Sequence, residues 1–121
     1  MPAPSQYGYP RSHRITRKSD LELVKKAGRR LRTEHLEVRT VDSLLSHARV
    51  AVVVAKHGHS IVERNRLRRR LRELVRTMLI PAAAGTDIVV RSMATAYETS
   101  FDQLKLEVEE VSSRLAKKAA S

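Results

Sequence analysis

Residues 49–80 read RVAVVVAKHGHSIVERNRLRRRLRELVRTMLI and contain the two patterns that decide the fold. The first is the continuously apolar run from Val50 to Ala55. Such a run is typical of a strand that is covered on both faces, at the centre of a sheet. We therefore predict a central strand over Arg49–Lys56, which Gly58 ends.

The second pattern is a basic helix. Ser60 and Glu63 form a capping box, so we predict a helix that begins at Ser60 and runs to Ile80, where Pro81 ends it. One face is apolar at helical spacing and consists of Leu67, Leu71, Leu74, Val75 and Met78. The other faces carry seven arginines, which are Arg64, Arg66, Arg68, Arg69, Arg70, Arg72 and Arg76.

Like charges this close repel one another. Pairs four residues apart, such as Arg64 with Arg68, each cost up to ~0.5 kcal/mol in an isolated helix. Arginine offers a planar fork that binds phosphate in a bidentate manner and stacks on bases. The helix therefore predicts a surface for a polyanion, although charge alone does not distinguish RNA, DNA and anionic lipid.

The flanking segments complete a small domain over residues 11–121, after a flexible tail at 1–10. The remaining predicted elements are a helix from an N-cap at Asp20 to Gly28, strands over His35–Val41 and Asp87–Arg91, and a last helix capped by Ser100. The order helix, strand, strand, helix, strand, helix predicts an α/β (α+β) two-layer sandwich with a small mixed sheet. We expect Val52 and Val54 to be buried together with Val89 and Leu67.

Composition excludes several functions. The 121 residues include 24 Lys and Arg against 13 acids, a net charge of +11, while 41% hydrophobic residues indicate a folded domain. The absence of Cys removes disulfides, thiolate metal sites and Cys nucleophiles. No stretch is apolar enough to span a membrane or to form a signal peptide, so we expect a cytoplasmic protein without a membrane partner.

Two further groups of polar residues receive ordinary interpretations. His57 and His59 flank Gly58, but no Cys or acidic cluster completes a metal site, so we expect them to contact phosphate near the start of the helix. Three acids of the last helix, Glu107, Glu109 and Glu110, are expected on its solvated face.

The stretch KHGHSIVERNRLRRRLRE at residues 56–73 closely resembles the signature of the bacterial ribonuclease P protein family. Its kernel is the triplet Arg64-Asn65-Arg66. The resemblance extends over most of the chain after residue 10. It includes the N-terminal segments His13-Arg14-Ile15 and Ser19-Asp20, the strands predicted at 49–56 and 87–91, and the helix from Ser100-Phe101 onward.

This resemblance implies a left-handed β-α-β crossover around the basic helix. It also implies a protein subunit of ribonuclease P, which binds the catalytic RNA subunit and the 5′ leader of precursor transfer RNA. Mg²⁺, bound mainly by the RNA subunit, would serve cleavage, and the protein alone would bind no cofactor and cleave nothing. Residues implied to bind the RNA subunit are Arg64, Asn65, Arg66, Arg68, Arg69, Arg70 and Arg72. Residues implied for the leader cleft are Arg14, Leu21, Lys25, Leu36, Arg39, Lys56 and His57.

The chain departs from the family where aromatic side chains commonly face the leader. The first helix has Leu21 and Lys25 at those positions, and the first predicted strand has none. Charge would then carry most of the leader contact. Two alternatives stay open, a general RNA- or ribosome-binding module and a nuclease in its own right.

Overall fold

A four-stranded sheet with the strand order β1-β2-β4-β3 forms the centre of the computed structural model, which describes residues 11–56 and 58–120. The strands are β1 (Arg29–Arg32), β2 (Leu36–Asp42), β3 (Arg49–Val53) and β4 (Thr86–Ser92). β4 pairs antiparallel with β2 and parallel with β3, so the sheet is mixed as predicted. The tail expected at residues 1–10 lies outside the described residues.

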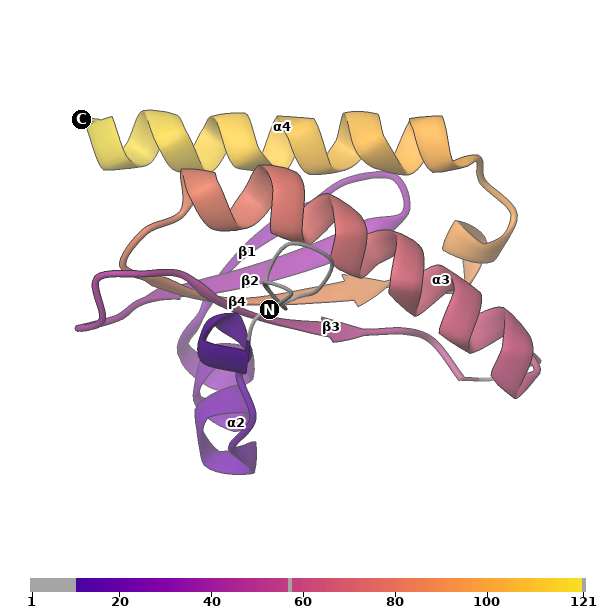
Figure 1. Ribbon diagram of the computed structural model, residues 1–121, viewed down its shortest axis with the longest axis horizontal. Helices are drawn as coiled ribbons and strands as arrows, with labels where there is room; N and C mark the ends of the chain where they lie inside the picture. The colour runs from indigo at the N-terminus through magenta and orange to yellow at the C-terminus, as the bar shows by residue number, and fades with distance from the viewer. Residues whose placement is uncertain (1–10, 57, 121) are drawn as a thin grey trace, which may run out of the picture.

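Helices lie on both sides of this sheet (Figure 1). α3 (Ile61–Leu74) and α4 (Phe101–Ala120) lie on one side, and α2 (Lys18–Ala27) lies on the other. The basic helix is longer than α3 itself, because a π-helical turn, η2 (Val75–Leu79), and a 3₁₀ turn, η3 (Ile80–Ala82), continue it to Ala82, with Pro81 inside the last turn. Two other 3₁₀ turns are η1 (Arg11–His13) and η4 (Ala94–Tyr97).

The two faces of the sheet hold separate hydrophobic clusters, because side chains alternate along each strand. Ile88 and Val90 of β4 belong to the main core, between the sheet and α3, η2 and α4. Val89 belongs instead to a second cluster beneath α2, with Ile15 and Val24. The predicted α+β sandwich is confirmed as the main core, and α2 covers part of the opposite face.

The expected burial is confirmed only in part. Val54 and Leu67 are buried in the main core, but Val52 is half-buried. Val89 is buried on the opposite face from these three residues. One face of an apolar strand therefore serves the main core, while the other packs towards α2.

One strand was missed from the sequence and another was misplaced. β1 was missed because its sequence Arg-Arg-Leu-Arg has one apolar residue, Leu31, as suits an exposed edge strand. β3 was predicted at the centre of the sheet but lies at its edge and ends at Val53 rather than Lys56. Part of its outer edge is covered by a bridge between Arg14 and Val50. A continuous apolar run therefore indicates that both faces of a strand are covered. It does not show that both edges of the strand pair with neighbouring strands.

The start of α3 was predicted correctly, and the start of α2 was not. The capping box of α3 is present, with the Glu63 backbone N–H donating to Ser60 Oγ at 3.1 Å. The predicted N-cap of the first helix is wrong, because α2 begins at Lys18 and Arg17 precedes it without a side-chain cap. Asp20 instead forms an ion pair with Arg49 at 3.4 Å, which joins α2 to β3.

The connection from β3 through α3 to β4 is a parallel crossover. The described order is helix, three strands, helix, strand, helix, with β1 as the added strand. The left-handed sense of the crossover, which the resemblance implies, remains a prediction.

Glu107 was expected on a solvated face, and this is wrong. Its side chain is only 5% exposed and joins α4 to the turn between β1 and β2. It accepts hydrogen bonds from Thr33 Oγ1 at 2.6 Å and from the His35 backbone N–H at 2.7 Å, and its Oε2 lies 2.6 Å from His35 Nδ1. Burial opposes ionisation, but these hydrogen bonds and one from Gln103 outweigh it and lower the pKa of Glu107 below its ordinary value of 4.5.

This network predicts how stability depends on pH. A carboxylate with a lowered folded pKa stabilises the fold above its unfolded pKa and loses that contribution as pH falls through the folded pKa. Glu107→Gln should lower the free energy of unfolding at neutral pH by about 1–3 kcal/mol. It should also flatten the loss of stability of the unsubstituted protein below about pH 4.5. Urea unfolding across a pH series measures both effects.

The matched control is Glu110→Gln, because Glu110 is an exposed acid of the same helix that pairs with Arg114. It should change stability by less than about 1 kcal/mol. Equal losses in the two variants would contradict the role assigned to Glu107.

Candidate nucleic-acid interface

The outer side of α3 forms a basic surface, here called the α3 surface. It consists of the residues predicted to bind the RNA subunit, Arg64, Asn65, Arg66, Arg68, Arg69, Arg70 and Arg72. The helix is held on the sheet by Leu67, Leu71 and Leu74, which are all buried. Because these three occupy the inner face, the polar residues are left outside: Arg64 and Arg68 are half-buried and the other five are exposed.

Few acids balance the charge of the α3 surface. Glu73 forms an ion pair with Arg76 at 2.5 Å. Glu63 accepts hydrogen bonds from the Ser60 backbone and has its pKa lowered by them and by His59. Among the described residues, no ion pair joins an acid to Arg66, Arg69 or Arg70. These cations therefore project an uncompensated positive field, which is the condition for binding a polyanion.

Tyr97 places an aromatic ring beside the start of α3. The Tyr97 and His59 rings are stacked, with centroids 3.5 Å apart and an angle of 12° between planes. The Tyr97 hydroxyl donates a hydrogen bond to the Ala55 carbonyl, and burial raises its pKa. With Arg66 and Arg70, Tyr97 lines a small hollow of about 100 Å³. Sequence reasoning missed Tyr97, because nothing in its local sequence places it against α3.

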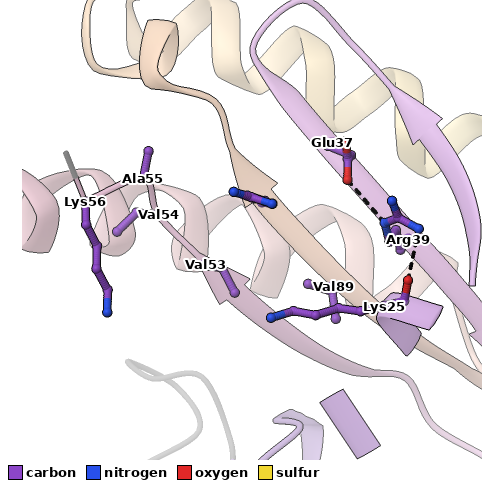
Figure 2. Close-up of a pocket in the computed structure, with 9 residues that line it drawn as sticks. Lys25, Glu37, Arg39, Val53, Val54, Ala55, Lys56 and Val89 are labelled. Carbon is purple, nitrogen blue, oxygen red and sulfur yellow. Dashed lines mark hydrogen bonds and ion pairs between the residues drawn. The ribbon is translucent and has the colours of Figure 1, made fainter. Parts of the chain in front are cut away.

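The opposite face of the sheet carries a groove of about 430 Å³, here called the cleft (Figure 2). Its apolar floor includes Val53 and Val89 from adjacent strands. Four cations line it, Lys25 from α2, Arg39 from β2, Arg91 from β4 and Lys56 after β3. A shallow apolar floor between cations suits a flexible anionic chain that is held without base-specific hydrogen bonds.

Among the described residues, one acid lines the cleft, Glu37, and it forms an ion pair with a neighbouring cation. Glu37 accepts a hydrogen bond from Arg39 Nε at 3.2 Å, and Arg39 Nη1 donates to the Lys25 carbonyl at 3.0 Å (Figure 2). These two contacts fix the Arg39 guanidinium between α2 and β2. The arginine therefore has a defined position beside the floor.

The structure brings together three of the residues implied for the leader cleft, Lys25, Arg39 and Lys56. Leu36 is a correction: its side chain is fully buried in the main core, because even-numbered residues of β2 face α3 and α4. Leu21 is half-buried and packs in the second cluster beneath α2.

Arg14 is not among the described residues that line the cleft. Arg14 is exposed and pairs with the edge of β3 through its backbone. His57 lies outside the described residues.

Sequence reasoning missed Arg91, Glu37 and the floor residues. The two-residue period of a strand could have placed Arg91 beside Val89, because residues two apart project from the same face. The register of β4 against β2 was needed to put Arg91 opposite Glu37, and no local pattern supplies that register.

The α3 surface and the cleft lie on opposite sides of one sheet and approach each other where β3 leads into α3. Lys56 lines the cleft, and His59 and Ser60 immediately precede α3. The domain can therefore present positive charge to two polyanions at once. Within the described part of the chain, no helix is long and apolar enough to cross a membrane.

One group of side chains could be considered for a metal. Glu34, His35 and Glu107 bring their ligand atoms within 4.8 Å of one another. The Glu107 oxygens are already occupied by the hydrogen bonds described above, and an imidazole does not suit Mg²⁺, which prefers octahedral oxygen ligands and water. The group is better explained as the structural anchor of α4.

Comparison with known proteins agrees with this geometry. A family model described as Ribonuclease P matches residues 9–116. The chain is 34% identical over 108 residues to the ribonuclease P protein component of Acidothermus cellulolyticus, covering 88% of this chain and 90% of that one. It is 38% identical over 98 residues to the component from Syntrophobacter fumaroxidans, with 78% and 82% covered.

A solved structure gives the same result for the fold. The RNase P protein from Thermotoga maritima superposes with a TM-score of 0.75 at 25% identity, covering 84% of this chain and 96% of that one. The family match over residues 9–116 includes all four strands, α3 and most of α4. This chain belongs to the ribonuclease P protein family.

Proposed function

We propose that this chain is the protein subunit of a ribonuclease P, which assists an RNA catalyst in removing the 5′ leader of precursor transfer RNA. The observation that carries the proposal is the pair of basic surfaces on opposite sides of one sheet, in a chain of this family. In this proposal the α3 surface binds the RNA subunit and the cleft binds the leader. Such an enzyme would act in the cytoplasm.

The α3 surface suits a structured RNA. Its cations lie on a rigid helix, so little side-chain ordering beyond the arginines themselves is needed on binding. Arginine forks bind phosphate in a bidentate manner, and each neutralised phosphate releases counterions. Binding through this surface would thus be strong at low salt and would weaken steeply as salt rises.

The cleft suits a single strand of variable sequence. None of the described residues that line it is aromatic, so these residues offer no stacking of about 1–3 kcal/mol per base. Its cations would hold the phosphates of the leader, and the floor of Val53 and Val89 would contact base or sugar edges. Holding the leader on one side and the RNA subunit on the other would position the scissile phosphate, which is itself a catalytic contribution.

The proposal assigns catalysis to the RNA subunit. Magnesium ions would be bound mainly by that RNA, and no side chain of this protein is assigned to them. Ser60 caps α3 by accepting a hydrogen bond from the Glu63 backbone N–H, and the neighbouring His59 contacts Glu63 and stacks on Tyr97, so the proposal gives Ser60 no nucleophilic role. The protein would contribute binding and orientation.

The test of this proposal is reconstitution. Purified protein alone should leave precursor transfer RNA intact, whereas the protein with its cognate RNA subunit should cleave at low magnesium, where the RNA alone is slow. Cleavage by nuclease-free protein that a point substitution abolishes would make the chain a nuclease in its own right. Recovery of ribosomes, rather than one structured RNA, in a pull-down would favour a general RNA-binding module.

The α3 surface should dominate affinity for the RNA subunit. Replacing Arg64, Arg66 and Arg68 together with Ala should weaken binding about tenfold to a hundredfold, if each contributes about 0.5–1 kcal/mol. The slope of log affinity against log salt should become shallower by about 0.9 for each lost phosphate contact on a duplex. Filter binding over a salt series measures both values.

The matched control removes three exposed cations from α4, which are Lys105, Arg114 and Lys117. It changes net charge equally, so its effect reports nonspecific attraction. An equal loss of affinity in the two variants would contradict a specific role for α3.

The cleft should set the preference for precursor over mature transfer RNA. Lys56→Ala should reduce that preference about twofold to fivefold, the size expected of one exposed charge contact. Affinity for the RNA subunit should hardly change, because Lys56 lies before α3. In the unsubstituted holoenzyme the preference should shrink as salt rises, since charge contacts are screened. A preference that survives high salt and ignores Lys56→Ala would refute this account of the cleft.

A further inference from the structure

A second hollow continues the cleft towards the end of β4. It has a volume of about 360 Å³ and shares Glu37, Ala55, Lys56 and Arg91 with the cleft. Its other lining residues include Arg32 of β1 and Met93, which follows β4. Because the two hollows share these four residues, they form one continuous groove that reaches the edge strand β1.

The register of β1 places two arginines on the face of the cleft. Arg30 pairs with Arg39, and Arg32 pairs with Glu37. Directly opposed residues of antiparallel strands project from the same face, so Arg30 and Arg32 share the face of Arg39. Arg29 pairs with the buried Thr40 and projects from the other face.

Arg30 and Arg32 make few side-chain contacts with the rest of the described domain. Both are exposed, and Arg32 Nη2 makes a weak contact with Met93 Sδ at 3.8 Å. No ion pair to a described acid involves Arg30 or Arg32. Arg30 directly faces Arg39, and like charges directly opposite each other destabilise a sheet. A polyanion over this face would relieve that repulsion.

We infer that Arg30 and Arg32 form an outer subsite in which a single-stranded polynucleotide leaving the cleft continues across β1. The inference rests on the proposed function, since the polynucleotide in the cleft would be the leader. Cations follow one another along the groove from Lys25 through Arg39 and Arg91 to Arg32. The outer subsite would hold phosphates of upstream nucleotides by charge, and it would extend a contact that lacks aromatic stacking.

The experiment uses the holoenzyme and a series of precursor transfer RNAs whose leaders are lengthened one nucleotide at a time. In the unsubstituted enzyme, affinity should rise until the leader fills the cleft and then rise again as it reaches β1. The variant Arg30→Gln/Arg32→Gln keeps the aliphatic stems and removes both charges. It should weaken binding of long leaders about twofold to fivefold per arginine, and leave short leaders unchanged. Its salt slope for long leaders should fall by about 0.7 per lost phosphate contact.

Arg29→Gln is the matched control, because it removes the same charge from the same strand on the opposite face. It should bind long leaders as the unsubstituted enzyme does, and thermal unfolding of all variants checks the fold. Unchanged binding of long leaders by Arg30→Gln/Arg32→Gln would overturn the inference. An equal loss for short leaders or mature transfer RNA would also overturn it, because the arginines would then contact another part of the complex.

Lys56→Ala separates this inference from the proposed function. If Lys56→Ala weakens the precursor preference while the β1 variant does not, the leader ends within the cleft and only the outer subsite is refuted. If neither substitution matters, the assignment of the cleft to the leader fails with it.

Discussion

The pairing of β4 along both of its edges is the constraint on which the rest of this structure depends. Its antiparallel register with β2 puts Arg91 opposite Glu37, and its parallel register with β3 puts Val89 beside Ala51. Because β4 is covered on both faces, alternate residues serve different purposes: Ile88 and Val90 anchor the helices, while Val89 and Arg91 build the cleft. A parallel partner also requires a crossover, and α3 is that crossover. The basic helix is thus fixed by the same strand that supplies the floor on the other side.

Local sequence patterns were sufficient to predict the elements that depend on capping residues and apolar spacing within one segment. The capping box at Ser60 and the apolar spacing of Leu67, Leu71 and Leu74 located the basic helix and its inner face. The same pattern fixed which arginines point outward. The α3 surface could therefore be predicted without knowledge of any other element.

The cleft depends on contacts between segments far apart in the sequence, and here local reasoning was weaker. The apolar run of β3 reports two covered faces, but only the register shows that one edge lacks a full partner strand. Leu36 was placed in the cleft by the family resemblance, and strand alternation could not correct this because it gives two faces without saying which one meets the helices. β1 has too few apolar residues to give a periodic pattern. Glu107 lies among other acids in the sequence, and only its contacts with the distant residues Thr33 and His35 explain its burial.

The crowding of arginines on α3 affects the stability of the chain when no ligand is bound. Their mutual repulsion is present whenever the surface is empty and disappears when phosphates neutralise it. Any ligand that binds only the folded form shifts the unfolding equilibrium by mass action. Copies made in excess of a polyanionic partner would therefore open more often and be degraded sooner than bound copies.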